Sequence, residues 1–170
     1  MMVSTKGRYA LRVMLDLAMQ KQEEYVSLND IAQRQKISES YLEQLVAKLK
    51  KAGLVVSIRG AAGGYRLARP ASGISVGDVL RALEGDVRAV ICTAQTEEGC
   101  EGEELCVTKY VWQRINESIE KTVDEMMIDQ LVAESRKAQE KAKNHDVDYS
   151  RNSCSGCMKR LWMSSPGLPS

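Results

Sequence analysis

The feature that most constrains the fold is a change in the spacing of apolar residues within the first 70 positions. Up to Gly53 the apolar residues recur every three or four positions, in three runs that predict amphipathic helices over 5–20, 28–36 and from 39 onward. From residue 54 a β-branched run, a turn with three glycines and a short apolar stretch predict a β-hairpin. The first 70 residues therefore predict three helices followed by a hairpin.

This order of elements is that of a winged helix-turn-helix, in which the third helix enters the DNA major groove and the hairpin reaches the flanking backbone or minor groove. Residues 1–70 carry 12 Lys/Arg against 6 Asp/Glu, although the whole chain has a formal net charge of only +1. A basic segment of this kind is the electrostatic footprint of a protein that binds a polyanion. The alternative is a solvated basic face on a small domain that the hairpin merely closes.

With Leu45 and its apolar neighbours facing the core, polar residues form the outward face of the third helix. Gln44 can read adenine through its amide, and Glu43 can accept a hydrogen bond from cytosine. The lysines supply attraction to phosphate that does not depend on sequence. In the hairpin, Arg59 and Arg66 flank the glycine turn, where a guanidinium can enter a narrow minor groove. The outward face and its flanks comprise Ser40, Glu43, Gln44, Ala47, Lys48, Lys50 and Lys51.

Beyond the hairpin the sequence predicts three further helices. Ser75 opens a short helix that ends near Gly85, whereas residues 89–106 show no sustained period and are interpreted as a loop. A long amphipathic helix and a further helical segment then run to about residue 143. A one-faced helix about 30 Å long can bury its apolar stripe against a second subunit, or alternatively against its own domain. The stripe consists of Val111, Trp112, Ile115, Ile119, Val123 and Met126.

The predicted fold class is mainly α with a small β-hairpin wing: a winged helix-turn-helix plus a long dimerisation helix. We expect residues 1–85 to form a DNA-binding head, 86–106 a cysteine-bearing loop, 107–143 the dimerisation helix with the helix after it, and 144–170 a disordered tail. No apolar run is long enough to span a bilayer, and the first residues lack the apolar core of a secretory signal. We therefore expect a cytoplasmic protein with no membrane partner.

Three of the five cysteines, Cys92, Cys100 and Cys106, lie in the predicted loop, with seven and then five residues between them. Thiolates grouped on a loop suit a soft metal or an iron–sulfur cluster, because the loop can wrap around it. Reduced thiols without a ligand and a redox disulfide are the alternatives. Cys154 and Cys157 form a separate pair with the spacing of a redox site or half a zinc site, or an exposed pair with no dedicated role.

Four stretches of the sequence resemble a family of bacterial transcription regulators. They are Ser4-Thr-Lys-Gly-Arg-Tyr-Ala10, Ser40-Tyr-Leu-Glu-Gln-Leu45, Lys51-Ala-Gly-Leu-Val55 and Val56-Ser-Ile-Arg-Gly-Ala-Ala-Gly-Gly-Tyr65, and the similarity extends to about residue 131. The family includes the iron–sulfur cluster regulator IscR, the cysteine-metabolism repressor CymR and the nitric-oxide sensor NsrR. The resemblance implies a homodimer whose long helices pair and whose two heads read a roughly palindromic double-stranded DNA operator.

The resemblance also implies which residues contact DNA. Those on the third helix are Ser40, Tyr41, Glu43 and Gln44, and those on the wing are Arg59, Gly64 and Tyr65. Residue chemistry adds Lys48 and Lys51 as phosphate contacts.

By resemblance, Cys92, Cys100 and Cys106 would hold an iron–sulfur cluster, of the 2Fe-2S type by analogy. The fourth ligand departs from the family, because Lys109 stands where IscR has a histidine and Arg8 where some nitric-oxide sensors have an aspartate. The fourth ligand stays open. The remaining candidates are Glu103, Glu104, a solvent or small-molecule ligand, and a tail cysteine.

We therefore expect a transcription regulator, not an enzyme, that senses iron–sulfur or redox status and controls iron–sulfur assembly or cysteine supply genes. Within the family, the alternative is a cluster-free repressor of cysteine-metabolism or nitric-oxide stress genes. A thiol-disulfide oxidoreductase using Cys154 and Cys157 is a rival from another class, and a DNA-binding module with structural zinc is a third.

Overall fold

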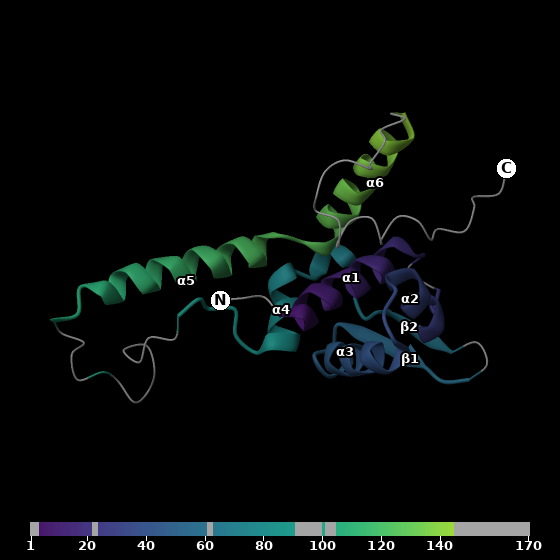
Figure 1. The fold of residues 1–170 in the computed structure, drawn as a ribbon, viewed down its shortest axis with the longest axis horizontal. Coiled ribbons are helices and arrows are strands. Elements are labelled where there is room, and N and C mark those ends of the chain that lie inside the picture. Colours follow the sequence, from purple (N-terminus) through teal and green to yellow (C-terminus); the bar gives the residue numbers. More distant parts are fainter. Residues whose placement is uncertain (1–3, 22–23, 61–62, 91–99, 101–104, 145–170) are drawn as a thin grey trace.

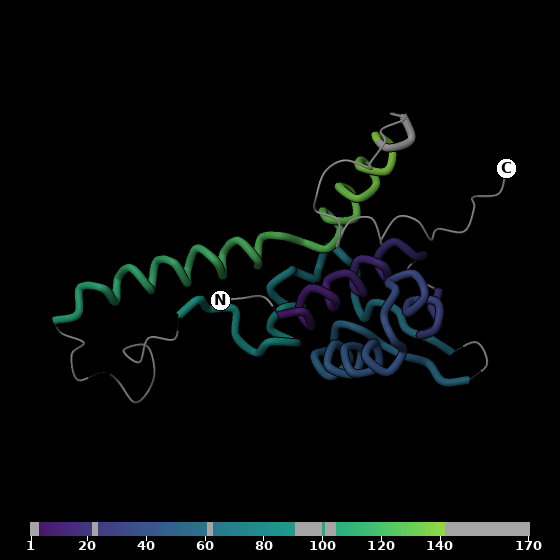
Figure 2. Tube along the Cα trace, viewed as in Figure 1, coloured from purple at the N-terminus to yellow at the C-terminus, as the bar shows by residue number. Residues whose placement is uncertain are grey.

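The computed structural model describes residues 4–21, 24–60, 63–90, 100 and 105–144, and the structural statements below concern this part of the chain. The elements are α1 Thr5–Met19, α2 Leu28–Gln35, α3 Glu39–Lys51, β1 Val55–Ile58, β2 Gly64–Leu67, the 3-10 turn η1 Ala71–Gly73, α4 Val76–Glu84, α5 Thr108–Glu125 and α6 Ile128–Asn144. The described helices and the one antiparallel hairpin confirm the predicted fold class (Figure 1, Figure 2). Among these helices none has both the length and the apolar character that crossing a membrane requires. The predicted disordered tail lies, apart from Asn144, outside the described residues.

Serine side chains begin the four helices of the head, the name used here for α1–α4 and the hairpin. Each serine supplies an acceptor for a backbone N–H that has no partner within its helix. Ser27 accepts from the N–H of Asp30, and Ser38 accepts from that of Tyr41. Ser75 forms a reciprocal capping box with the side chain three residues later. Because these caps are local, the helices start where the sequence predicts.

One apolar core holds the head together, and every helix of the head and the hairpin contribute to it. A charged pair lies beside this core, where Arg34 of α2 donates to both carboxylate oxygens of Asp16 of α1, at a shortest distance of 2.9 Å. Desolvation offsets much of the attraction in a buried pair, so this contact fixes the angle between two helices more than it adds stability. The core includes Ala10, Val13, Met14, Leu17, Ile31, Leu42, Leu45, Val46, Leu49, Leu54, Val55, Ile74, Val79, Leu83 and Ile128.

The hairpin forms the wing, and a third segment holds it to the head. β1 and β2 pair antiparallel along their full length. Val26, before α2, donates to Tyr65 O at 2.9 Å and accepts from Tyr65 N at 2.8 Å. Gly64 is buried against this segment, and a Cβ there would lie 2.5 Å from Val26 O. The wing therefore needs glycine at position 64 to pack against the head.

The chain turns at the elbow, residues Met126 and Met127 between α5 and α6, where it is hydrogen-bonded to the head. Val76 N donates to Met126 O at 2.8 Å, and Ile128 N donates to Ile74 O at 2.9 Å. From the elbow α5 projects away from the head, with its N-terminal end farthest from it (Figure 1). The predicted long helix and its successor are thus two rods that meet at a fixed joint.

We expect Gly64→Ala to lower the free energy of unfolding by about 1 to 3 kcal/mol, because the added methyl group would have to displace the backbone of Val26. Gly73→Ala is the matched control. A Cβ there approaches only Arg69 Cδ, at 4.0 Å, so we expect a change below about 0.5 kcal/mol. Urea unfolding followed by circular dichroism measures both variants, and equal stabilities would contradict the packing role of Gly64.

Candidate functional site

The polar face of α3 that is predicted to read DNA lies on the outside of the head. The opposite side of α3 is buried in the core, which fixes the direction of this face. Three lysines in the last turn place positive charge at its C-terminal end. The exposed residues of the face and its flanks are Ser40, Glu43, Gln44, Ala47, Lys48, Lys50 and Lys51.

Tyr41 differs from its exposed neighbours on α3, since it is half-buried and packs against the core of the head. It meets Tyr9 of α1 edge-on, with ring centroids 5.8 Å apart. Burial raises the pKa of Tyr41 above its usual value, and the nearby Tyr9 and Glu84 raise it further. This residue, predicted to contact DNA, therefore serves to set α3 against α1 in the free protein.

Two lysines of α3 bond within the head. Lys48 Nζ donates to Leu83 O of α4 at 3.4 Å, and Lys50 Nζ donates to Ser57 Oγ of β1 at 2.6 Å. These bonds restrict where the ammonium groups point. A cation that is already restrained loses less conformational entropy when it meets a phosphate.

In the wing, the structure separates the two arginines predicted to flank the turn. Arg59 is exposed beside the tip, whose residues 61–62 lie outside the described part of the chain. Arg66 is half-buried, and its guanidinium lies over the ring of Tyr25, 5.1 Å from the centroid. Tyr65 is also half-buried and is hydrogen-bonded to the segment before α2. Of the two arginines, only Arg59 is thus exposed, whereas Arg66 and Tyr65 hold the wing to the head.

Two exposed basic residues at the start of α1, Lys6 and Arg8, are not among the DNA contacts that the sequence predicts. The tyrosine contact between α1 and α3 places this turn beside the start of α3. Glu84 of α4 steadies it by accepting from Gly7 N at 3.1 Å. Both residues lie in the Ser4–Ala10 stretch that shows the family resemblance, so a signal for them was present.

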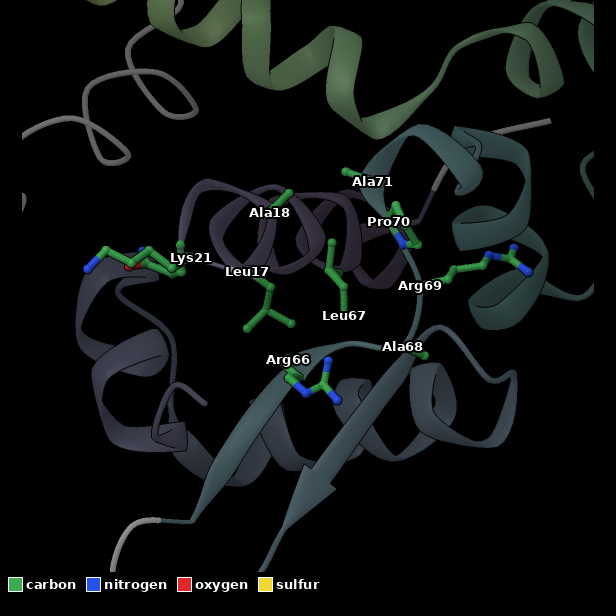
Figure 3. Close-up of a pocket in the computed structure, with 10 residues that line it drawn as sticks. Leu17, Ala18, Lys21, Arg66, Leu67, Ala68, Arg69, Pro70 and Ala71 are labelled. Carbon is green, nitrogen blue, oxygen red and sulfur yellow. The ribbon is translucent and has the colours of Figure 1, made fainter. Parts of the chain in front are cut away.

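A cavity of about 230 Å³ opens between the end of α1, β2 and η1 (Figure 3). Leu17 and Leu67 lie in its middle, while Lys21 and Arg69 point to opposite sides. Arg69 is paired with Asp78 at 2.7 Å. A small-molecule site needs polar groups that converge on one point. Lys21 and Arg69 diverge, so these two charged groups do not converge on a ligand in the cavity.

Cys106 stands just before the first turn of α5, in a setting that favours its thiolate. Its Sγ lies 3.3 Å from Thr108 Oγ1. The Thr108 hydroxyl, followed by the backbone N–H of Lys109, lowers the pKa of Cys106 below its usual value, and the Lys109 ammonium adds to the effect. A thiolate is the form that binds metals and attacks electrophiles.

Only part of the predicted ligand set lies among the described residues. Cys100 is exposed, whereas Cys92, both candidate glutamates and both tail cysteines lie outside the description. Within it, no three Cys, His, Asp or Glu side chains are grouped as a metal site. Lys109 lies over the ring of Tyr110, 5.5 Å from its centroid, and a protonated amine has no lone pair to offer a metal. Cys100 and Cys106 thus fit a soft metal or cluster in donor chemistry, and Lys109 does not.

The predicted apolar stripe of α5 is exposed in the single chain over its N-terminal half, whereas Ile119 is half-buried and Val123 packs against the apolar cluster that α4 contributes to. Val111 is 51% exposed, Trp112 37% and Ile115 38%. Tyr110 extends the exposed apolar surface toward the N-terminal end of the helix. Single apolar side chains on a surface are normal, whereas a contiguous row is typical of an interface. This face of α5 therefore has the chemistry to pack against another apolar surface.

Comparison with known proteins agrees with these features. Residues 3–134 match the model of the Rrf2 family, described as an iron-dependent transcriptional regulator. The transcriptional regulator IscR of Pectobacterium carotovorum is 42% identical over 151 residues, which cover 89% of this chain and 90% of that protein. IscR of Serratia proteamaculans is 46% identical over 132 residues, covering 78% and 79%.

Two solved structures share the fold. IscR of T. potens superposes with a TM-score of 0.65 at 44% identity, covering 82% of this chain and 91% of that chain. CymR, described as the global cysteine regulator of B. subtilis, superposes with a TM-score of 0.65 at 39% identity, covering 78% and 97%. The similarity thus extends over most of each protein.

We expect Thr108→Ala to shift the pH profile of Cys106 alkylation to higher pH, because it removes the largest interaction that lowers the pKa of this thiol. The reaction with iodoacetamide is followed across pH in a chain whose other four cysteines are serine. Thr122→Ala is the matched control, since its hydroxyl donates to Ser118 O farther along α5. A profile that moves in both variants or in neither would contradict the assignment to Thr108.

Proposed function

The chain belongs to the Rrf2 family of transcriptional regulators, and from this premise we propose that it is a homodimeric DNA-binding regulator that senses iron–sulfur or redox status. The proposal rests on the combination of two features in one chain. The polar face of α3 is exposed, and Cys106, at the far end of α5 from the head, has surroundings that favour its thiolate. Members of this family regulate transcription and are not enzymes, which argues against the thiol-disulfide oxidoreductase considered above.

In this proposal α3 lies in the major groove of a double-stranded operator. Gln44 and Glu43 supply an amide and a carboxylate for base edges, and the small Ala47 lets the helix approach closely. Arg59 reaches the minor groove from the wing. We propose that the protein acts on DNA in the cytoplasm. The phosphate contacts come from Lys48, Lys51, Lys6 and Arg8.

The exposed apolar stripe of α5 supports the homodimer. Leaving Trp112, Ile115 and their neighbours in water costs free energy that a second copy of the same stripe would recover. A two-fold dimer uses one patch on both chains and presents two heads to a palindromic site. The proposed dimer therefore supplies both the cover for α5 and the second recognition helix.

The three loop cysteines would hold the cluster, with Cys106 as the ligand whose surroundings are described. The hydrogen bond from Thr108 and the N-terminal end of α5 stabilise negative charge on its sulfur. A bound 2Fe-2S cluster would supply a redox-active centre whose oxidation or loss changes the charge at this end of the helix. The remaining ligand would come from a group other than Lys109.

The elbow gives the proposed signal a route to DNA. Besides its backbone bonds, α5 is tied to α4 by Arg81, which donates to both oxygens of Asp124 at 2.7 Å each. A change in how two α5 helices pair would therefore change the spacing of the two α3 helices. Affinity for a particular operator would change with it. By analogy with the relatives, the controlled genes would serve iron–sulfur assembly or cysteine supply.

The likeness to CymR supports a second candidate, a cluster-free repressor of cysteine-metabolism or nitric-oxide stress genes with the same head and the same dimer. In that case Cys106 would act as a free thiol, and its lowered pKa would favour direct reaction with oxidants. A DNA-binding module with structural zinc is the third candidate.

We expect Gln44→Ala to cost about 1 to 3 kcal/mol of binding to the preferred operator and to relax specificity at one base position. The operator is selected from a pool of random duplexes, and binding is measured at several salt concentrations. Gln113→Ala is the matched control, because it removes an exposed amide from α5, far from the head. The complex should contain two chains per duplex. An unchanged preference for Gln44→Ala would contradict the docking of α3.

We expect protein purified without oxygen to contain iron and acid-labile sulfide in matching amounts, and Cys92→Ser to lose both, because the cluster needs all three loop thiolates. Elemental analysis and the visible spectrum measure the loading. A colourless, iron-free wild type would overturn the cluster and favour the thiol-based repressor. Zinc in place of iron, with operator affinity indifferent to redox state, would favour the structural-zinc module.

A further inference from the structure

The first turn of α1 is held by a side chain from another helix. Glu84, the last residue of α4, accepts hydrogen bonds from Ser4 Oγ and, at 3.1 Å, from Gly7 N. Ser4 in turn accepts from Lys6 N at 3.1 Å. The first turn of a helix has backbone N–H groups without partners in the helix itself, and here a local serine and a distant carboxylate each satisfy one. Glu84 therefore ties the end of α4 to Gly7, 77 residues earlier in the chain.

The charge at the start of α1 differs from that of the other helices of the head. α2, α3 and α4 each have an acidic residue of their own in the first turn, namely Asp30, Glu39 and Asp78, whereas α1 has none. Lys6 stands there instead. A cation at the positive end of a helix dipole is unfavourable, and a carboxylate is favourable. The carboxylate of Glu84 therefore offsets a placement of Lys6 that helix stability alone would not favour.

Lys6 lies on the side of α1 that faces α3. It precedes Tyr9 by three residues, so the two side chains share one face of the helix. Tyr9 meets Tyr41 of α3 edge-on. Burial raises the pKa of Tyr41, and Tyr9 and the nearby Glu84 carboxylate raise it further. Because Lys6 is exposed and Tyr9 is half-buried, the Lys6 side chain extends from the head beside the start of α3.

The same turn of α4 also contacts α3 directly. The exposed Lys48 donates from Nζ to O of Leu83, the residue before Glu84, at 3.4 Å. Consecutive Cα atoms lie about 3.8 Å apart, so one small part of α4 holds both Lys48 and the turn that carries Lys6. A cation loses less entropy on meeting a phosphate when its position is set before binding. The end of α4 thus sets the position of two cations relative to α3.

We propose that Glu84 is a positioning residue for DNA binding, which holds the first turn of α1 so that Lys6 reaches a phosphate beside the groove that α3 enters. The inference rests on the proposed function, in which α3 lies in the major groove and Lys6 contacts the backbone. Glu84 does not touch DNA in this arrangement and, as an anion, repels it. Its contribution is to fix where a cation lies, and this contribution outweighs the repulsion.

Two substitutions separate positioning from charge. Glu84→Gln removes the negative charge but keeps an oxygen that accepts from Gly7 N, whereas Glu84→Ala removes both. Charge alone predicts that both substitutions tighten DNA binding by the same factor. Positioning predicts that Glu84→Gln binds at least as tightly as the wild type and that Glu84→Ala binds more weakly. Glu84 is exposed and lies outside the core, so both variants should fold.

Binding of the full-length chain to a labelled operator, selected from a pool of random duplexes, is measured by fluorescence anisotropy at several salt concentrations. Glu84→Ala should weaken binding by about three- to tenfold, the factor expected when one polar contact loosens. Its plot of log affinity against log salt should be shallower by about 1 to 2, because the proposed dimer carries two copies of Lys6. Glu134→Ala is the matched control. It removes an exposed carboxylate that pairs with Lys137 on α6, away from α3 (Figure 1), and should change affinity by less than about twofold.

A background that lacks the cation separates positioning from a general loss of stability. In Lys6→Ala, the two substitutions at Glu84 should bind DNA alike, because no ammonium is left to place. An equal effect of the two substitutions in the wild-type background, or an unchanged difference between them in Lys6→Ala, would overturn the inference. A wild type that binds no duplex would instead overturn the proposed function, and the phosphate role of Glu84 with it.

Amide hydrogen exchange tests the hold on α1 in the absence of DNA. The N–H of Gly7 should exchange faster in Glu84→Ala than in the wild type or in Glu84→Gln, since only the first lacks an acceptor at this position. Equal exchange in all three chains would overturn the role of Glu84 even where operator binding by the wild type supports the proposed function.

Discussion

The backbone hydrogen bonds that join the elbow to the start of α4 hold α5 at one angle to the head, and the rest of the proposed mechanism depends on that angle. They are accompanied by the ion pair of Arg81 and Asp124, whose side chains are 37% and 46% exposed. Pairs in such settings contribute about 0 to 1 kcal/mol. The backbone hydrogen bonds and the buried Ile128 therefore supply most of the stability of the elbow. The ion pair selects the rotation of α5 about its axis. Glycine at position 77 admits this pair, since a Cβ there would overlap the Asp124 carboxylate.

A fixed elbow makes α5 a lever with its proposed sensing end far from its DNA-reading end. The helix has 18 residues, about 27 Å, so a 2 Å shift at its N-terminal end corresponds to roughly 4° at the elbow. A tenfold change in operator affinity corresponds to about 1.4 kcal/mol. A rearrangement worth one hydrogen bond at the paired α5 helices is therefore enough for regulation, and no unfolding of the head is required.

Much of this fold could be predicted because it depends on interactions between residues close in the sequence. Contacts between distant segments could not be predicted. Ser27 and Ser75 begin helices through bonds to the next turn, and the glycine turn of the hairpin acts within a few residues, so the sequence shows them directly. The outward face of α3 follows from the spacing of its buried leucines. Two contacts could not be predicted, because each joins segments that only the folded chain brings together. They are the placement of Arg66 over Tyr25 and the hydrogen bond from Asn116 to Val90 O. The DNA contacts and cluster ligands among the predicted residues stay predictions.

Thermodynamic linkage makes the proposed coupling reciprocal, because the factor by which the cluster changes operator affinity is also the factor by which the operator changes cluster affinity. If the loaded form binds DNA more tightly, operator-bound chains retain the cluster best; if the cluster-free form does, they lose it most readily. Cluster binding and operator binding are then coupled steps of one equilibrium, and α5 is the element that connects the two sites.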